Sequence, residues 1–344
     1  MIEVSHPVLL KQHFLKLIRI FGIEADMSRI AVIGSNMVDL VSYVDRMPLE
    51  GETLEAPRFV IGCGGKGANQ AIAAARTGAD VLFITRVGDD IFSEQTIRNL
   101  QDSGIDTKYV KKSPGFSSGV APIFVHPDSH NSILIIKGAN RCLNAASIEE
   151  AADDIQKCAL IVLQLEVELE AVYAAIDFGA RHHIPVLLNP APAIADLDEN
   201  SIGKLDFLVP NETELSLISG MPVTSTETAR LAARALLAKG IKNVIATLGV
   251  QGALYVGQEG EWVVPGITVQ AVDTTGAGDA FVGCFARFWS ETRDIRAAME
   301  KAVLYSACSV TACGTQTSYP DQQKFQEFQE SLSKHPHPHA MSAA

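Results

Sequence analysis

Short apolar segments alternate with helical segments along most of this chain, and this alternation limits its fold more than any other feature. The apolar segments are rich in Val, Ile and Leu, as strands buried on both faces of a sheet are. They lie at 29–34, 81–86, 160–165, 185–188 and 207–210, with helical patterns between them, for example at 168–182. Strand and helix units in this order predict an α/β fold with a largely parallel sheet.

The turn after the first predicted strand reads G-S-N-M-V-D, residues 34–39. It lacks the second and third glycines of the dinucleotide fingerprint G-x-G-x-x-G, so the sequence disfavours a nicotinamide enzyme. Asp39 instead falls just past the carboxyl end of the strand, where open α/β sheets bind their ligands. On position alone, an ordinary turn aspartate is an equal alternative.

Polar residues also follow other predicted strands. Because the carboxyl ends of parallel strands meet at one edge of a sheet, we expect these residues to line that edge. They are Glu166, Asn189, Asn211, Glu214 and Thr247. Asn211 with Glu214 also fits a helix cap of the capping-box type, and residues 224–227 have the same form.

The segment D-T-T-G-A-G-D-A-F, residues 273–281, is a loop of small residues that runs into a helix. Its glycines leave the backbone free to approach a ligand. A helix start attracts anions through unpaired amides and the helix dipole, and Asp279 sits in the first turn. The pattern indicates phosphoryl transfer, with Asp279 accepting a proton from the attacking hydroxyl. The alternative is a capped helix in which Asp279 only complements the dipole.

A second glycine-rich loop, G-C-G-G-K-G-A-N-Q at residues 62–70, opens a predicted helix over 66–77. This helix start also points at a ligand. A tight strand-to-helix turn is the alternative, but Lys66 and Asn69 are polar groups that such a turn does not require. The loop therefore favours ligand binding.

These two motifs, in this order, resemble the N-terminal and C-terminal signatures of the ribokinase family of carbohydrate kinases, over residues 29–320. The resemblance implies the ribokinase-like fold, in which helices flank a mainly parallel central sheet and a small β-sheet forms a lid over the sugar. It also implies an ATP-dependent pentose kinase that transfers the γ-phosphate to the 5-hydroxyl of D-ribose or 2-deoxy-D-ribose. Mg²⁺ would accompany ATP, and K⁺ would act as an activating cation.

The resemblance also assigns roles at the reacting centre and the sugar. Asp279 would be the base, and the amides of Gly276, Ala277 and Gly278 would hold the transferring charge. Sugar contacts are implied for Met37, Val38, Asp39, Gly65, Lys66, Gly67, Ala68, Asn69, Glu166 and Asp279.

Nucleotide and metal contacts follow from the same resemblance. Nucleotide contacts are implied for Asn211, Thr247, Leu248, Gly249, Val250, Gln251, Gly252 and Gly278, although residues 247–252 alone read only as a hairpin turn. Glu214 would order magnesium indirectly. A potassium site is implied at Asp273, Thr275, Ser309, Ala312, Gly314 and Ser318. Val303 departs from the family, which commonly has an asparagine beside the adenine.

Two weakly alternating segments, 40–61 and 118–138, predict a small sheet beside the main one. The resemblance implies that this sheet is the lid and also a homodimer surface. We expect one α/β kinase domain over 29–333. Residues 1–28 form an N-terminal extension with an amphipathic helical pattern, and residues 334–344, in which histidine and proline alternate, are expected to be a disordered tail.

Charge and composition exclude other classes of protein. The net charge of -12 argues against a nucleic-acid or anionic-membrane partner, since both need a basic face. No apolar run approaches the roughly 20 residues of a membrane span. The six cysteines are scattered without a C-x-x-C pair, which indicates reduced thiols and a cytoplasmic protein.

Within the resemblance, other functions stay open: a hexose or adenosine kinase, or a non-catalytic sugar-binding regulator. A regulator would be expected to lose the base or the anion-binding loop, and both are intact. The choice of pentose turns on Met37, at a position where ribose-selective relatives commonly carry an asparagine. Methionine offers a sugar hydroxyl no comparable partner, so we expect 2-deoxy-D-ribose to be accepted well.

Overall fold

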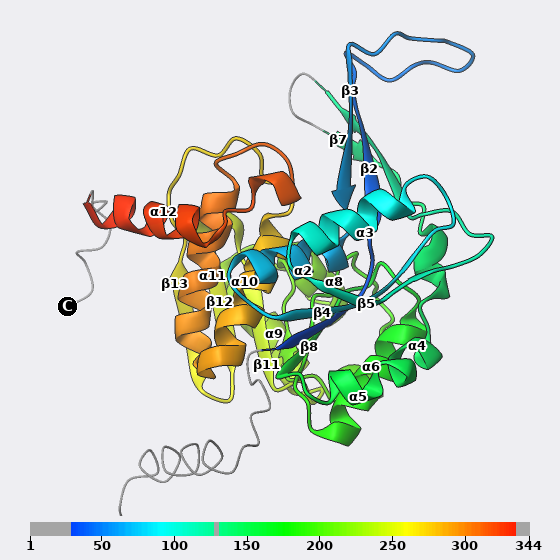
Figure 1. Ribbon diagram of the computed structural model, residues 1–344. Coiled ribbons are helices and arrows are strands. Elements are labelled where there is room, and N and C mark those ends of the chain that lie inside the picture. Colours follow the sequence, from blue (N-terminus) through cyan, green and yellow to red (C-terminus); the bar gives the residue numbers. More distant parts are fainter. Residues whose placement is uncertain (1–28, 127–130, 335–344) are drawn as a thin grey trace, which may run out of the picture.

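The computed structural model describes residues 29–126 and 131–334, so the predictions for residues 1–28 and for the chain end from 335 lie outside the described residues. Its largest element is a nine-stranded sheet. The strands are β1 Ile30–Ile33, β4 Val81–Val87, β5 Asp106–Lys112, β8 Leu160–Leu163, β9 Val186–Leu188, β10 Phe207–Leu208, β11 Asn243–Thr247, β12 Gly252–Gly257 and β13 Gly260–Pro265. The spatial order is β13-β12-β11-β10-β9-β8-β1-β4-β5 (Figure 1).

All neighbours from β11 to β5 pair in parallel, while β12 and β13 add an antiparallel hairpin at one edge. The expected α/β class with a mainly parallel sheet is therefore confirmed. The turn at residues 247–252 joins the antiparallel strands β11 and β12 through a short 3₁₀ helix, η2 Gly249–Gln251, as the hairpin pattern predicts.

Helices cover both faces of this sheet because successive strand residues point to opposite sides. In β1, Ile30 and Val32 join one hydrophobic core, and Ala31 and Ile33 join the other. The first core contains side chains of α2 Lys66–Arg76, α3 Ser93–Asp102, α10 Ala277–Thr292, α11 Ile295–Ser309 and α12 Gln322–Lys334. The second contains side chains of α4 Ala145–Glu150, α5 Ala152–Ile155, α6 Leu169–His182, α7 Glu199–Ile202, α8 Glu212–Ser219 and α9 Thr226–Leu237.

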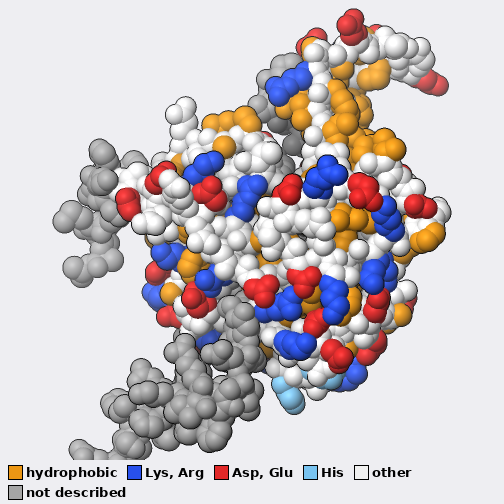
Figure 2. Space-filling view, viewed as in Figure 1, with side chains coloured by type: hydrophobic (Ala, Val, Ile, Leu, Met, Phe, Trp, Pro, Cys, Tyr) orange, Lys and Arg blue, Asp and Glu red, His pale blue; other side chains and the backbone are white. Residues whose placement is uncertain are grey.

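A separate four-stranded sheet stands out from the body of the molecule at the top of Figure 1. It consists of β3 Arg58–Gly64, β2 Met37–Tyr43, β6 Val120–Val125 and β7 Asn131–Ile133, in that order. Hydrophobic side chains gather on it (Figure 2), among them Phe59, Ile133 and Leu134, which are 48–61% exposed. We call it the small sheet.

The small sheet joins the main body beside Asn36, between β1 and β2. Asn140, in η1 Gly138–Cys142, donates from Nδ2 to the Asn36 carbonyl at 2.7 Å and accepts from the Asn36 N–H at 3.0 Å. Asn36 itself donates to Thr85 Oγ1 in β4 at 2.8 Å. The connection from β1 to β2 and the one from β7 to η1 are thus tied to each other and to β4 beside the carboxyl ends of the parallel strands.

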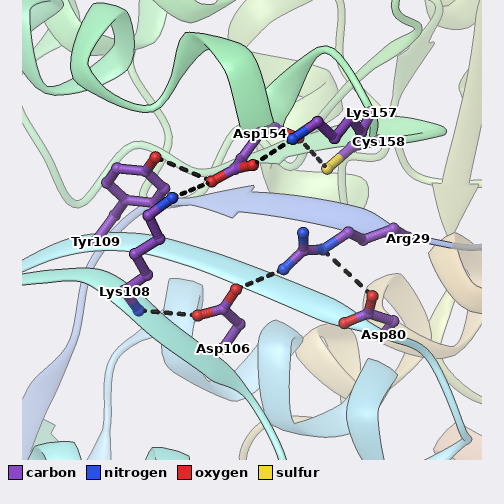
Figure 3. Close-up of polar contacts among 8 residues, drawn as sticks. All are labelled: Arg29, Asp80, Asp106, Lys108, Tyr109, Asp154, Lys157 and Cys158. Carbon is purple, nitrogen blue, oxygen red and sulfur yellow. Dashed lines mark hydrogen bonds and ion pairs between the residues drawn. The ribbon is translucent and has the colours of Figure 1, made fainter. Parts of the chain in front are cut away.

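The opposite ends of the strands carry an ion-pair network (Figure 3). Arg29, just before β1, pairs with Asp106 at 2.5 Å and Asp80 at 3.3 Å. Asp154 accepts hydrogen bonds from Lys108, Lys157 and Tyr109 at 2.6–3.0 Å. These donors, Lys108 first, hold the pKa of Asp154 well below its usual range. The network fastens the amino ends of β1, β4 and β5, far from the edge where ligands are expected.

None of the helices in the described ranges has the length and hydropathy needed to cross a bilayer. All six cysteines are free thiols. Burial raises the pKa of the Cys158 thiol to about 12, so this thiol stays protonated at neutral pH.

Candidate active site

Two helix starts, those of α2 and α10, meet at the carboxyl edge of the parallel sheet. Both helices follow the glycine-rich loops that the sequence singled out. They pack closely because Gly283 of α10 has no side chain: a Cβ there would lie 2.5 Å from the carbonyl oxygen of Gln70 in α2. This packing brings side chains about two hundred residues apart in sequence into hydrogen-bonding distance.

Asp279 lies in the first turn of α10, and two amides of α2 hold its carboxylate. Asn69 Nδ2 donates to Oδ2 and Gln70 Nε2 donates to Oδ1, each at 2.9 Å. The Asp279 side chain is well buried, with the residue only 6% exposed. Because one amide holds each oxygen, the plane of the carboxylate is fixed.

The start of α10 offers backbone amides beside this carboxylate. Gly276 has a φ of 77°, a left-handed conformation that favours glycine, and Tyr319 donates its hydroxyl to the Gly276 carbonyl at 2.9 Å. Within the described residues, the N–H groups of Gly278 and Asp279 have no hydrogen-bond acceptor. A Cβ at Gly278 would meet nothing within 4 Å, so this backbone borders open space. The arrangement suits an anion.

Two adjoining cavities meet at this helix start. The larger has a volume of about 580 Å³, within the usual range for a ligand site. The smaller, of about 170 Å³, is lined by Asp279 and Lys66 among others. Asn211, Thr274 and Gly278 line both cavities. The anion site therefore lies where a large ligand and a small one would meet.

Most residues predicted to contact a nucleotide line the larger cavity: Asn211, Thr247, Gly249, Val250, Gly252 and Gly278. Leu248 and Gln251 do not. Leu248 is buried in the core between the sheet and its helices, and Gln251 accepts a hydrogen bond from Thr226 Oγ1 at 2.9 Å.

One face of α11 also lines the larger cavity, and sequence reasoning missed most of it. The residues are Val303, Ser306, Ala307 and Val310, of which only Val303 drew attention in the sequence. Their spacing of three and four residues marks one face of a helix, which continues to the C-cap residue Val310, and all four are small or β-branched. This spacing is the signal that would have found the face. The loop at 266–271 also lines this cavity and has no such periodicity.

Lys66 is the cation of the smaller cavity. Burial acts to lower the pKa of its ammonium, yet the net shift is upward. The opposing effect comes from three nearby carboxylates, those of Asp279, Glu166 and Glu214. Lys66 is therefore charged and lies among acidic groups beside the anion site.

Glu214 is held by the capping box that the sequence predicted. Its two carboxylate oxygens accept from the backbone N–H and the Nδ2 of Asn211, at 2.9 and 3.0 Å. Burial raises its pKa above the usual value. The similar pattern at 224–227 forms its box one residue later, between Ser225 and Thr228.

Asp39 and Glu166 lie on the side of the site next to the small sheet. Asp39, in β2, lies over the backbone of Gly64, where a Cβ would be only 2.3 Å from its Oδ2. Glu166 Oε2 accepts from Ser35 Oγ at 2.6 Å and from the Lys66 N–H at 2.8 Å. Gly65 has a φ of 88°, so the loop needs glycine there.

The pKa of Asp39 is raised to about 7. Burial is the main cause, and the negative charges of Glu166 and Asp279 add to it. The neighbouring residues Met37 and Val38 are buried, each 2% exposed, as are Gly67 and Ala68 at the start of α2. Most of the predicted sugar residues therefore come together at this end of the small sheet.

The residues predicted to bind potassium lie just before α10 and at or after the end of α11, and hydrogen bonds join these segments. Asp273 accepts from the N–H groups of Thr275 and Gly314, both at 2.9 Å. The Asp273 N–H donates to the Val310 carbonyl at 3.2 Å, which brings residues 309–312 to the same place, and Ser318 closes the loop through Thr315. No group of three His, Cys, Asp or Glu side chains in the described ranges is arranged to hold a metal ion. A cation here would need backbone carbonyls beside the Asp273 carboxylate.

Several known proteins that are similar to this chain in sequence and fold are carbohydrate kinases. Deoxyribokinases from Salmonella typhi and Salmonella typhimurium are each 60% identical over 299 residues, which is 87% of this chain and 98% of theirs. Mouse ribokinase is 38% identical over 302 residues, 86% of this chain and 93% of its own.

Solved structures agree with this similarity. Ribokinase from Arabidopsis thaliana, complexed with ribose and ATP, superposes with a TM-score of 0.83 at 28% identity, over 88% of this chain and 98% of that one. Ribokinase from Thermotoga maritima gives 0.80 at 34% identity, over 88% and 99%. A model of the pfkB family carbohydrate kinases matches residues 27–322. The resemblance drawn from the two glycine-rich loops is thus confirmed, and this chain belongs to the pfkB family of carbohydrate kinases.

Proposed function

We propose that this protein is an ATP-dependent pentose kinase that phosphorylates the 5-hydroxyl of 2-deoxy-D-ribose, and also of D-ribose, to give the 5-phosphate. One observation carries the proposal: the Asp279 carboxylate lies beside unpaired backbone amides where a large and a small cavity meet. The named activity of the relatives that are 60% identical supports the choice of pentose.

The reaction follows from this geometry. The pentose lies beside Asp39 and Glu166, and its hydroxyl reaches the smaller cavity at Asp279. The hydroxyl oxygen attacks the γ-phosphorus of ATP, while its proton passes to Asp279. The bond from the γ-phosphorus to the bridging oxygen breaks, and ADP leaves. The unpaired amides of Gly278 and Asp279 stabilise the charge on the transferring group, whereas the N–H of Ala277 already donates to the Thr274 carbonyl at 3.2 Å. Lys66 neutralises charge beside this group.

ATP occupies the larger cavity, with its base against the α11 face and its phosphates toward Gly278. When bound with ATP, Mg²⁺ neutralises phosphate charge. Asn211 orients both oxygens of Glu214, and the family resemblance implies that Glu214 would help to hold the ion through water.

Asp39, Gly65, Asn69 and Glu166 orient the sugar through hydrogen bonds to its hydroxyls. Met37 presents an apolar side chain two residues before Asp39 and offers no hydrogen bond to a 2-hydroxyl. A pocket that does not pair this hydroxyl does not penalise the sugar that lacks it.

The small sheet covers the sugar as a lid and pairs two copies of the chain into a homodimer. The hydrophobic side chains exposed on it support this role, since monomers rarely expose such patches. Sedimentation as a monomer at micromolar concentration would contradict the dimer. The six free thiols support a cytoplasmic location.

Replacing Asp279 with Asn should lower kcat for 2-deoxy-D-ribose by about 10²–10⁴-fold, because the base is lost. The fold and the KM for ATP should change little. Asp153→Asn, an exposed aspartate at the other end of the sheet, is the matched control and should keep parental activity. Retention of most of the kcat by Asp279→Asn would exclude the proposed base.

Sugar binding should strengthen as Asp39 ionises, because only the carboxylate accepts hydrogen bonds from two hydroxyls. With the pKa of Asp39 raised to about 7, kcat/KM for the pentose should rise between pH 6 and pH 8. In Asp39→Asn, kcat/KM for the pentose should be lower than in the parent and should not rise between pH 6 and pH 8.

The pH dependence of unfolding tests the raised pKa of Asp39 independently of activity. Its folded pKa lies above the unfolded one, so the stability contributed by neutral Asp39 is present at low pH and is lost as the pH rises to about 7. The free energy of unfolding of Asp39→Asn, relative to that of the parent, should therefore increase by roughly 1 kcal/mol between pH 6 and pH 8. A pH-independent difference in urea unfolding would show that Asp39 is not perturbed.

Met37→Asn should move preference from 2-deoxy-D-ribose toward D-ribose by ~1–3 kcal/mol if the new amide pairs the 2-hydroxyl. The measurement is kcat/KM for both sugars in parent and variant, with adenosine and a hexose as further acceptors. A strong preference of the parent for D-ribose, or for adenosine or the hexose, would overturn the proposed substrate.

We also propose that K⁺ binds at Asp273, Thr275, Ser309, Ala312, Gly314 and Ser318 and raises activity. This cluster adjoins the anion-binding loop, since a Cβ at Gly276 would lie 2.4 Å from the Thr315 side chain. Turnover should be higher in potassium than in a bulky organic cation at matched ionic strength. Equal rates in the two cations would contradict activation by K⁺ at this site.

A further inference from the structure

A chain of amide side chains leads to Asp279 from each side, and the proposed chemistry does not account for most of its members. One branch runs from Asn99 through Gln316 to Asn69, and the other runs from Gln164 to Gln70. We call the two branches the amide relay. Four of its members are almost fully buried: Asn69, Gln70, Gln164 and Gln316 are 0–6% exposed.

The first branch joins three separate parts of the chain. Asn99 Nδ2 donates to Gln316 Oε1, Gln316 Nε2 donates to Asn69 Oδ1, and Asn69 Nδ2 donates to Asp279, all at 2.9 Å. Gln316 begins the 3₁₀ helix η3 Gln316–Ser318. Arg76 of α2 fixes that turn by donating to the carbonyl of Gln316 at 2.6 Å.

The second branch comes from the main sheet. Gln164, just after β8, donates from Nε2 to Gln70 Oε1 at 2.6 Å, and Gln70 Nε2 donates to Asp279 at 2.9 Å and to Asn189 Oδ1 at 3.0 Å. Gly34 leaves room for Gln164, since a Cβ there would lie 1.9 Å from its Oε1.

The direction of every bond follows from chemistry. An amide has a donor end and an acceptor end, whereas a carboxylate only accepts. Each amide that touches Asp279 must therefore turn its NH₂ group toward it and its carbonyl away. That outward carbonyl needs a donor behind it, because a buried polar group without a partner costs free energy. Gln316 and Gln164 supply those donors.

We propose that Gln316 and Gln164 are positioning residues for phosphoryl transfer, because they hold the amides of Asn69 and Gln70 in the orientation that donates to Asp279. The inference rests on the proposed role of Asp279 as the base. With either amide reversed, a carbonyl oxygen would face the carboxylate, repel it and turn it away from the pentose hydroxyl.

Gln316→Glu and Gln164→Glu test this directly, because each keeps the shape of the side chain and removes its donor. The neighbouring amide then turns its NH₂ group to the new carboxylate and its carbonyl to Asp279. We expect kcat for 2-deoxy-D-ribose to fall about 10–100-fold at pH 8.5, with the KM for ATP changed less than about threefold.

The pH profile separates this effect from a structural one. A protonated carboxyl group donates a hydrogen bond, so the new acid restores the relay when it is neutral. The ratio of variant to parent kcat should therefore rise as the pH is lowered from 8.5 to 6. In Gln316→Met and Gln164→Met, which have no donor at any pH, the ratio should be reduced and constant.

Gln101→Glu makes the same change on the surface of α3 and should leave kcat and its pH profile at parental values. The proposal is overturned if both Gln→Glu variants keep parental kcat, or if their losses match those of the Met variants at every pH. If one variant fails to fold by thermal unfolding, the other branch carries the same test. Asp279→Asn, measured alongside, separates the two ideas: if it keeps its kcat, the base assignment fails, whereas its loss with unaffected relay variants refutes only the relay.

Discussion

The close packing of α2 against α10 is the constraint on which the rest of the site depends. Gly283 allows it, since any side chain there would collide with the backbone of α2 at Gln70. This contact sets Asp279 between Asn69 and Gln70 and aims both helix starts at one point. The first glycine-rich loop follows β3 of the small sheet and the second follows the antiparallel strand β13, so the contact between α2 and α10 is what brings the two loops together. A shift of either helix would separate the carboxylate from its amides.

The electrostatics of the site follow from this geometry. The chain is acidic overall, with a net charge of -12, so the positive potential needed for phosphate must be local. Lys66 supplies one charge, and the amides at the start of α10 supply partial charges that need no reorganisation when a phosphoryl group arrives. Asp39 shows the opposite effect, since burial near two other carboxylates raises its pKa to about 7. The site therefore combines groups that attract phosphate with a cluster of carboxylates, in which the ionisation of Asp39 is disfavoured.

Features with a local pattern could be predicted from the sequence, and features made by distant contacts could not. The alternation of strand and helix gave the α/β class, and the Asn211 capping box and the hairpin at 247–252 followed from short-range rules. The capping box near 224–227 was predicted one residue too early, because the N-cap of α9 is Ser225 rather than Thr224. Gln316 and Gln164 drew no attention, since no spacing rule connects them with a residue far away in sequence, and the α11 face was missed although its periodicity was visible.

Identification of the product of 2-deoxy-D-ribose and ATP by phosphorus NMR tests the central claim most directly. In the proposed reaction, the hydroxyl that loses its proton to Asp279 lies next to the anion-binding amides and belongs to carbon 5. We therefore expect one new phosphomonoester whose phosphorus couples to the two protons on carbon 5, formed in step with ADP. A phosphate on carbon 1, or release of ADP with inorganic phosphate and no sugar phosphate, would contradict it.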